Sequence, residues 1–526
     1  MRTYAVFIDL VKAFDTVNRR LLWARFRSFG ICGKLFWALK TGYSGCTLQG
    51  KMAGYLSSIF KDVGLGVRQG DVDSSDGFAL FVDDLDAEIA KAETKLGRKL
   101  GIPLIGNNDA ARGDRIPVLK HADDTVILAT CEEDAQALLE AVEKWCQKWQ
   151  ISPNPDKCVV IVFDKKVHSP KLCLLGKILK VVDETVYLGY LLHRLGSWAP
   201  HVVRRVDKAR NWDRIASAIL GHAGGATAAV AAEVRDASAE VGALYGGEMW
   251  GTLSPSESGR YVDQAQAAVG KAILHVRSTA EAEGVLSELG WTASSVKAWK
   301  HRLTLWWRLG RTKSALLNTI EWQAEKQSNQ LCSDYNWWSG THRELVKLTE
   351  LTGSPPEKLR GLKKRQFQCI LNGAAFKHEK HIRLLAMKTS SRLSSLADEL
   401  ETKILRSSAK SWKELQAGYL PYVSSKYHIR LLAMTRLGLL PIEVETGRWH
   451  NIAKHERWCN LCKNILGCTH HFLRECDKLK SSAVPHWSAA PKRNDSQAGI
   501  WWRTVAQNLE KRWREKRQLQ TSVSQT

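Results

Sequence analysis

The sequence predicts an α+β first part, a mainly helical second part and a small cysteine-rich metal site near the C-terminus. Short apolar runs of strand length alternate with helical patterns up to about residue 195. Helical patterns then dominate, and four of the 12 cysteines cluster between Cys459 and Cys476. The 526 residues are enough for several domains of ordinary size.

Three apolar runs in the first part predict buried strands, because each has strand length and is rich in β-branched residues. They are residues 6–8, 126–128 and 159–163. The stretch 132–150 predicts an amphipathic helix, since its apolar residues recur with helical spacing. The expected apolar side consists of Ala135, Leu138, Leu139, Val142 and either Trp145 or Cys146.

The net charge is +23, while hydrophobic residues make up 44% and charged residues 25% of the chain. This balance is that of a globular protein. The positive surplus favours nucleic acid as a partner ahead of a membrane surface, because basic residues that neutralise phosphates release bound counterions. There is no signal-peptide run and no apolar stretch long enough to span a bilayer. We therefore expect a nuclear and/or cytoplasmic protein that is not secreted.

The cysteine cluster has the spacing Cys459-x2-Cys462-x8-His471-x4-Cys476. A Cys-x2-Cys pair and a second pair from a short helix supply four ligands for a closed tetrahedral Zn²⁺, with His470 as an alternative to His471. The competing interpretation is a pair of buried cysteines without a metal. A closed site leaves no open position for a substrate, so we expect a structural or nucleic-acid-binding role.

Three aspartates are the candidate catalytic residues. Asp9 ends the first apolar run, and Asp123 and Asp124 lie between two apolar runs that predict a hairpin. A solvated turn is the simpler explanation of the adjacent pair taken alone. If the first strand lies beside the hairpin, the three carboxylates converge and divalent cations would neutralise them. Two such cations suit nucleotidyl transfer.

Five motifs occur in the order and approximate spacing of motifs A to E of reverse transcriptases. They are FIDLVKAFD around Asp9, GVRQG at 66–70, HADD at 121–124, NPDK at 154–157 and YLG at 187–189. Their wording resembles the reverse transcriptases of non-LTR (LINE-type) retrotransposons. An ordered set over about 190 residues is far more specific than any one motif.

The resemblance implies an RNA-directed DNA polymerase with an antiparallel palm sheet, which acts on an RNA template, a DNA primer and deoxynucleoside triphosphates. Asp9 and Asp123 would bind two Mg²⁺ ions, with Asp124 supporting them. Phe14 matches the bulky residue that excludes a ribose 2′-hydroxyl, although a core aromatic is a competing interpretation. Lys157 matches a lysine near the incoming triphosphate, with an exposed surface lysine as the alternative. The template and nucleotide pocket would be shaped by Gly66, Arg68, Gln69 and Gly70.

The resemblance also implies a division of the chain into five parts. We expect a palm at 1–195, a helical thumb at 196–311, a helical connecting region at 312–450, a CCHC zinc knuckle at 451–485 and a basic tail at 486–526.

Three departures from the family pattern are visible. Only eight residues precede Asp9, so we expect the fingers to be missing. GVRQG is followed by DVDSSD at 71–76, without the usual prolines and with three aspartates that would repel phosphate. His121 stands where the family has Tyr or Phe. The alternative function is therefore an inactive retroelement remnant that only binds nucleic acid.

Two basic, aromatic-rich stretches are further candidates for nucleic-acid binding. Residues 299–311 interleave tryptophans with basic residues, although tryptophans at helical spacing usually belong to a core. Residues 511–517 form a basic run for which a solvated helix end is the default interpretation. The heptapeptide HIRLLAM occurs at 381–387 and again at 428–434, and the sequence alone assigns it no function.

Overall fold

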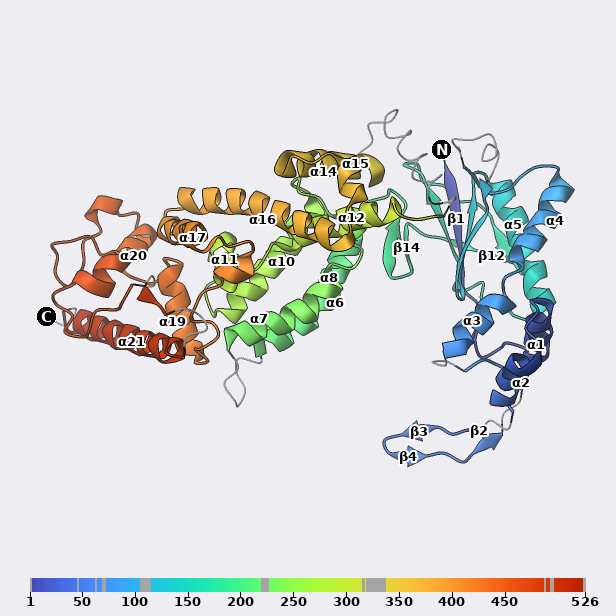
Figure 1. Ribbon diagram of the computed structural model, residues 1–526, viewed down its shortest axis with the longest axis horizontal. Coiled ribbons are helices and arrows are strands. Elements are labelled where there is room, and N and C mark those ends of the chain that lie inside the picture. The colour runs from blue at the N-terminus through green and yellow to red at the C-terminus, as the bar shows by residue number, and fades with distance from the viewer. Residues whose placement is uncertain are drawn as a thin grey trace. The chain divides into compact units, whose positions relative to one another are not determined.

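The computed structural model describes residues 2–44, 47–61, 64–68, 72–104, 115–218, 227–314, 317, 337–486, 489–491 and 496–523. The chain divides into two compact units (Figure 1). The first unit contains Met1–Trp198 and Lys313–Tyr335, and the second contains Ala199–Thr312 and Asn336–Thr526. None of the helices in these described segments has the length and apolar character needed to cross a bilayer.

The first unit combines strands and helices. Its elements are β1 (Thr3–Ile8), α1 (Arg19–Ser28), α2 (Gly33–Gly42), β2 (Thr47–Leu48), β3 (Lys51–Met52), β4 (Tyr55–Leu56), β5 (Phe60–Lys61), α3 (Val72–Phe81), α4 (Leu85–Leu96), β6 (Ile102–Pro103), β7 (Arg115–Ile116), β8 (Val118–His121), β9 (Asp124–Ala129), α5 (Glu132–Trp149), β10 (Val159–Phe163), β11 (Cys173–Leu174), β12 (Lys177–Ile178), β13 (Lys180–Val181), β14 (Glu184–Tyr187) and β15 (Tyr190–His193).

A five-stranded sheet of order β13-β10-β1-β9-β8 forms the centre of this unit. β1 pairs antiparallel with β9 on one side and with β10 on the other. The three predicted strands are therefore confirmed as immediate neighbours. The expected antiparallel sheet holds for β8, β9, β1 and β10, but β13 lies parallel to β10 at the edge. The β11–β12 hairpin lies between β10 and β13 in the sequence. This connection allows β13 to run in the same direction as β10 at the edge of the sheet.

The two faces of the central sheet have different partners. Successive side chains of a strand point to opposite faces, and on β1 one set consists of Tyr4, Val6 and Ile8, which belong to the buried core. α5 packs against β9 and β1 and contributes to this core. On the other face, the ring of Phe7 lies 5.6 Å from that of Tyr187.

The helix predicted at 132–150 is confirmed as α5, which begins at Glu132 and ends at Trp149. Acidic residues occupy its first turn, where the helix dipole stabilises negative charge. Gln150 ends it in the left-handed conformation, with φ of 55°. All of the expected apolar side is buried, and Trp145 and Cys146 are both included.

The second unit is helical in its described residues. Its elements are α6 (Ala199–Ala218), α7 (Ala228–Ala237), α8 (Ala239–Ala243), α9 (Gly247–Trp250), α10 (Glu257–Ile273), α11 (Ala282–Leu289), α12 (Ser294–Leu309), α14 (Trp337–Thr352), α15 (Pro356–Gly361), α16 (Lys364–Thr389), α17 (Ser394–Ser407), α18 (Trp412–Leu415), α19 (Lys426–Arg436), α20 (Glu443–Trp449), η3 (Lys454–Glu456), η4 (His471–Glu475) and α21 (Ala498–Val523). The predicted thumb, connecting region, knuckle and tail all contribute to it, and their boundaries stay predictions.

The tryptophans of α12 lie inside this unit. Trp299, Trp306 and Trp307 have exposed fractions of 0%, 2% and 7%. Trp307 stacks on Phe367 of α16 with the ring centroids 5.5 Å apart. Buried rings offer no face to a nucleic-acid base, so the core interpretation of these tryptophans holds and the stacking interpretation is wrong.

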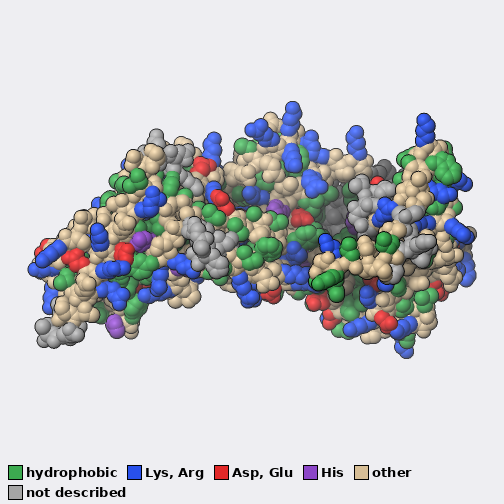
Figure 2. All heavy atoms as spheres, turned by 90° about the horizontal axis from the view of Figure 1, so that it is seen from below, with side chains coloured by type: hydrophobic (Ala, Val, Ile, Leu, Met, Phe, Trp, Pro, Cys, Tyr) green, Lys and Arg blue, Asp and Glu red, His purple; other side chains and the backbone are tan. Residues whose placement is uncertain are grey.

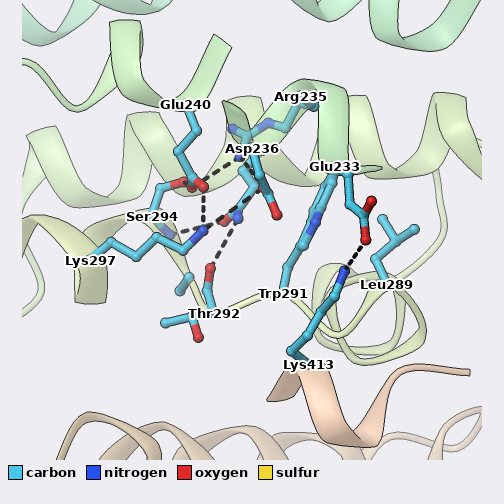
Figure 3. Close-up of polar contacts among 12 residues, drawn as sticks. Glu233, Arg235, Asp236, Glu240, Leu289, Trp291, Thr292, Ser294, Lys297 and Lys413 are labelled. Carbon is cyan, nitrogen blue, oxygen red and sulfur yellow. Dashed lines mark hydrogen bonds and ion pairs between the residues drawn. The ribbon is translucent and has the colours of Figure 1, made fainter. Parts of the chain in front are cut away.

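A buried polar network fixes the start of α12 against α7 and α8 (Figure 3). The carboxylate of Glu240 accepts a hydrogen bond from the Ser294 hydroxyl at 2.9 Å and pairs with Arg235 at 3.0 Å. It also pairs with Lys297. Burial would raise the pKa of Glu240, but Lys297 and Arg235 outweigh it and hold that pKa at about 2. Glu240 therefore stays ionised at neutral pH and anchors the start of α12 through Ser294 and Lys297.

α9 and α12 approach so closely that only glycine fits at the end of α9. A Cβ atom on Gly251 would lie 2.1 Å from the carbonyl oxygen of Ala298. We predict that Gly251→Ala destabilises the second unit by about 1–3 kcal/mol, because backbone must move to relieve the overlap. Thermal unfolding followed by tryptophan emission measures the effect.

Gly373→Ala on α16 is the matched control for this substitution, since no atom lies within 4 Å of its added Cβ. This variant should be neutral or gain about 0.5–1 kcal/mol from the higher helix propensity of alanine. Equal unfolding temperatures for Gly251→Ala and the unchanged protein would contradict the close approach.

Candidate active site and metal centre

Asp9 and Asp124 meet on one face of the central sheet. Ile8 pairs with Thr125, so the next residues along β1 and β9 are Asp9 and Asp124. Both follow the alternation of Phe7 and Val126, which places them on the sheet face away from α5. The predicted convergence of strand and hairpin is therefore confirmed.

Asp123 lies at the turn of the β8–β9 hairpin, as the sequence predicted. His121 pairs with Asp124, leaving Ala122 and Asp123 as the two turn residues. Ala122 has φ of 54°, the positive value that tight two-residue hairpins require. The turn thus presents two consecutive carboxylates, and both are exposed.

The carboxylates influence one another electrostatically. Partial burial raises the pKa of Asp124, and the negative charges of Asp123 and Asp9 raise it further, while His121 lowers it. Burial and the charge of Asp124 likewise raise the pKa of Tyr187. Like charges held together are the situation that a bound cation relieves, and oxygen ligands are those that Mg²⁺ prefers. The chemistry of these residues therefore suits a divalent cation, although their carboxylate oxygens are not gathered around one point.

The turn at 154–157 is attached directly to Asp9. The Asn154 N–H donates to the Asp9 carbonyl at 2.8 Å, and the Asp9 N–H donates to the Cys158 sulfur at 3.3 Å. Lys157 places its Nζ atom 4.0 Å from the Asp9 carboxylate, with 67% of its side chain exposed. The structure thus brings Lys157 to the predicted site. The contribution of Cys158 was missed, because a lone cysteine in an apolar run gives no signal of this contact.

The start of the GVRQG motif packs against the loop that follows β1. Gly66 has φ of 80°, and a Cβ there would lie 2.8 Å from the Asp15 carbonyl oxygen. The Val67 N–H donates to the Phe14 carbonyl at 2.8 Å, and Arg19 Nε donates to the Gly66 carbonyl at 2.7 Å. This contact of Arg19 was missed, since it joins residues far apart in sequence.

The remaining residues of this motif differ in their placement. Arg68 donates to the Gly42 carbonyl and lies over the ring of Tyr43, 5.1 Å from its centroid. Gln69 and Gly70 lie outside the described residues. α3 begins at Val72 and contains Asp73 and Asp76 of the acidic run that departs from the family pattern.

Phe14 is half-buried and stacks on Phe78 of α3, with the ring centroids 4.6 Å apart. Phe78 itself is fully buried. The ring therefore belongs partly to the core, as the competing interpretation proposed. It also remains partly accessible, so a selective role toward the sugar stays a prediction.

Cys459, Cys462, His471 and Cys476 form the candidate metal centre. One ligand atom from each lies within 4.8 Å of the others, and they form the one such group found in the described part of the chain. Cys462 Sγ lies 3.2 Å from His471 Nε2, and Cys459 Sγ lies 3.9 Å from Cys476 Sγ. Asp9, Asp123 and Asp124 are neighbours, but their carboxylate oxygens do not all lie within this distance of one another.

The thiols of this centre suit a metal cation. Burial raises the pKa of Cys462, but the backbone N–H groups of Asn464 and Ile465 outweigh it and lower that pKa overall. Burial and the neighbouring Cys459 raise the pKa of Cys476 to about 11. Crowded thiols with opposed pKa shifts become thiolates together when a cation binds. The donor set of three sulfurs and one nitrogen is typical of structural Zn²⁺.

The structure distinguishes the two adjacent histidines. His471 is 1% exposed and directs Nε2 toward Cys462. His470 is exposed, and its Nδ1 lies 3.0 Å from Glu475 instead. His471, rather than His470, is therefore the histidine placed to bind a metal with the three cysteines.

α21 covers the metal centre. Arg512 is 2% exposed and donates to the carbonyls of Phe472 at 2.5 Å and Ser481 at 2.7 Å. Lys516 is 1% exposed and pairs with Glu443 at 2.8 Å. These two basic residues of the predicted tail support the fold and are not available to nucleic acid.

The first unit thus presents three neighbouring aspartates, one at the end of β1 and two at the turn of the β8–β9 hairpin. Residues 1–192 match the family model described as reverse transcriptase (RNA-dependent DNA polymerase). This part of the chain, 1–192, is thus similar to a reverse transcriptase domain.

The curated relatives are polymerases of a mobile element. The chain is 26% identical over 211 residues to the RNA-directed DNA polymerase from mobile element jockey of Drosophila melanogaster, covering 38% of this chain and 21% of that protein. It is 27% identical over 203 residues to the protein of the same description from Drosophila funebris, covering 37% of this chain and 20% of that protein. The matches thus span about a fifth of the length of these relatives.

We predict that Asp124→Asn slightly stabilises the protein at neutral pH. The pKa of Asp124 is raised in the folded state, so the contribution of this residue to stability is fully present below the ordinary value of 3.8 and is lost as pH rises through the folded pKa. Asparagine removes this loss, and the melting temperature at pH 7 should rise by about 1 °C after solvent screening. Calorimetry at pH 7 and near pH 4 checks it, because the gain should shrink at the lower pH. A gain that is independent of pH would contradict the electrostatic origin.

We predict that His471→Ala loses the bound metal while His470→Ala keeps it. Removal of one of four ligands opens the site, whereas His470 lies outside it. The metal content of each purified variant after dialysis, measured by mass spectrometry, decides the matter. Equal metal content in both variants would show that the two histidines are interchangeable.

Proposed function

We propose that the first unit is the palm of an RNA-directed DNA polymerase of a non-LTR element. It would transfer nucleotides from deoxynucleoside triphosphates to the 3′-hydroxyl of a DNA primer on an RNA template. The observation that carries this proposal is the meeting of Asp9 with Asp124, and the turn residue Asp123 beside them, on the accessible face of the sheet. The match of residues 1–192 to the reverse transcriptase family supports it.

In this proposal Asp9 and Asp123 hold two Mg²⁺ ions, and Asp124 supports them electrostatically. The ions, when bound, supply charge stabilisation for the attacking and leaving oxygens. The raised pKa of Asp124 supports the assignment, because burial and, after it, repulsion from Asp123 and Asp9 disfavour the carboxylate, and a bound cation would relieve that repulsion. The pairing of β1 on both sides and the bond from the Asp9 N–H to Cys158 fix the backbone from which the Asp9 carboxylate projects.

Phe14, Arg68, Gln69, Gly70 and Lys157 are proposed to bind the nucleotide and template. The ammonium of Lys157 is close to the carboxylates yet exposed, which suits a phosphate of the incoming nucleotide. The Val67 N–H, at the start of the GVRQG motif, donates to the Phe14 carbonyl. This contact supports a pocket shared by the GVRQG motif and the segment around Asp9 and Phe14.

The second unit is proposed to hold Zn²⁺ at Cys459, Cys462, His471 and Cys476 as a structural ion. The burial of this centre beneath α21 supports a structural role rather than direct contact with nucleic acid. Lysine and arginine side chains are spread over the face shown in Figure 2, on both units. Their positive charge supports RNA and DNA as partners.

The second candidate function is nucleic-acid binding without catalysis. It is favoured by the acidic run at 71–76 and by His121, which stands beside the carboxylates. Negative charge next to a triphosphate path opposes substrate binding. This candidate requires the basic surface alone.

Primer extension on poly(rA) with an oligo(dT) primer and Mg²⁺ tests the proposal. We predict extension by the wild-type chain and a loss of about a thousandfold or more in Asp123→Asn, because one metal ligand is removed. Asp86→Asn is the matched control, since Asp86 is an exposed carboxylate in the first turn of α4. Its activity should equal that of the wild type.

Two outcomes contradict the polymerase proposal. Extension that survives in Asp123→Asn would show that the carboxylates are not catalytic. No extension by a folded chain that binds RNA, with an affinity that falls steeply with salt, would support the binding function instead.

A further inference from the structure

The repeated heptapeptide HIRLLAM has two different environments. The first copy, residues 381–387, lies within α16, and the second, residues 428–434, lies within α19. Both copies are helical throughout, so the same side chains point in the same directions around their helices. Any difference in burial between them therefore comes from the surrounding elements.

In the second copy one helix face is covered by α21. His428 Nε2 lies 2.7 Å from the carboxylate of Glu510 on α21, and Leu432 lies one turn further along the same face of α19. Ile429 and Leu432 both have exposed fractions of 0%. α19 and α21 pack side by side (Figure 1).

In the first copy the equivalent face is open. Ile382 and Leu385, which match Ile429 and Leu432, have exposed fractions of 52% and 57%. His381, which matches His428, is exposed as well. We call His381, Ile382 and Leu385 the α16 face.

The opposite side of α16 is buried, which fixes this orientation. Leu384 and Met387 have exposed fractions of 9% and 0% and belong to the core of the second unit. Arg383 is buried as well and pairs with Glu379 one turn earlier. The α16 face is therefore a second apolar face on a helix whose first face already builds the core.

A groove continues the α16 face. Its volume is about 790 Å³, and Ile382 contributes to its wall. Much of the remaining wall comes from α10, including Ala267, Ala268 and Ala272. Small residues on α10 beside a large exposed residue on α16 leave room for apolar side chains of another helix.

The exposed charged side chains that α16 itself carries are positive. Glu379 is the only acidic residue of α16, and it is buried in its pair with Arg383. The exposed charged residues of the helix are all basic; Lys388 pairs with Glu401 of α17, whereas Lys377 donates to the Leu351 carbonyl and has no acidic partner among the described ion pairs. A partner with negative charge is therefore favoured.

We propose that the α16 face docks an acidic amphipathic helix of a partner protein. The apolar stripe of that helix covers Ile382 and Leu385 and enters the groove, and one of its carboxylates pairs with His381. The contact of Glu510 with His428 is the precedent for this pair within the same chain. α21 of a second copy fits less well, because it carries six basic and two acidic residues.

A synthetic peptide tests the docking. It has the sequence of residues 498–523 with the changes Arg503→Glu, Lys511→Glu, Arg514→Glu and Arg517→Glu. All four positions are exposed on α21, so the apolar stripe and Glu510 are retained. The labelled peptide is titrated with the full chain in a fluorescence anisotropy experiment. We expect binding at least tenfold tighter than that of the unchanged α21 peptide.

Substitutions in the protein locate the binding site. Leu385→Asp and, separately, Ile382→Asp should each weaken binding of the acidic peptide at least tenfold. Leu405→Asp is the matched control, because Leu405 is 78% exposed on α17 and lies outside the α16 face. Circular dichroism establishes that all three variants are folded.

The remaining outcomes overturn the proposal. Absence of peptide binding, or equal binding by Leu385→Asp and the wild type, shows that the α16 face does not dock the helix. Displacement of the peptide by a single-stranded oligo(rA), with RNA affinity reduced in Leu385→Asp but not in Leu405→Asp, assigns the surface to nucleic acid instead.

Discussion

The pairing of β1 on both edges is the constraint on which the first unit depends. β1 is the third strand of five, bonded to β9 on one side and to β10 on the other. A central strand has its backbone groups satisfied in both directions, so Asp9 at its end is held in position by its neighbours. β9 places Asp124 beside it, and the turn before β10 places Lys157 on its other side. Segments about 150 residues apart in sequence are joined in this way.

The two faces of the central sheet have different roles: one is packed in the core and the other carries the carboxylates. Its helix-covered face is built from apolar residues such as Val6 and Ile127, which are almost completely buried. Its other face ends in three carboxylates, and partial burial together with their mutual repulsion raises the pKa of Asp124. The apolar face offsets the repulsion, because burial of large side chains contributes about 1.5–3 kcal/mol each. Closely spaced charges with shifted pKa values are common at the functional sites of proteins.

In the second unit, charged side chains take part in folding rather than in binding. Lys516 and Glu443 form a buried pair beside the metal centre, and Arg512 satisfies carbonyl groups around it. A buried charge is tolerated when it is paired and hydrogen-bonded. The count of 77 lysine and arginine residues therefore overstates how many are available to a polyanion, since these residues and Arg235 are buried and bonded within the protein.

The sequence by itself determined the features that arise from short-range patterns. Alternating apolar runs and turn residues located β1, the β8–β9 hairpin and α5, and ligand spacing located the four residues of the metal centre. Only the tertiary structure decided which faces are covered, because burial depends on elements remote in sequence. The buried tryptophans of α12, the parallel edge strand β13 and the internal role of Arg512 belong to this group. The two copies of HIRLLAM illustrate the reason: identical local chemistry is covered in α19, where α21 packs, and open in α16.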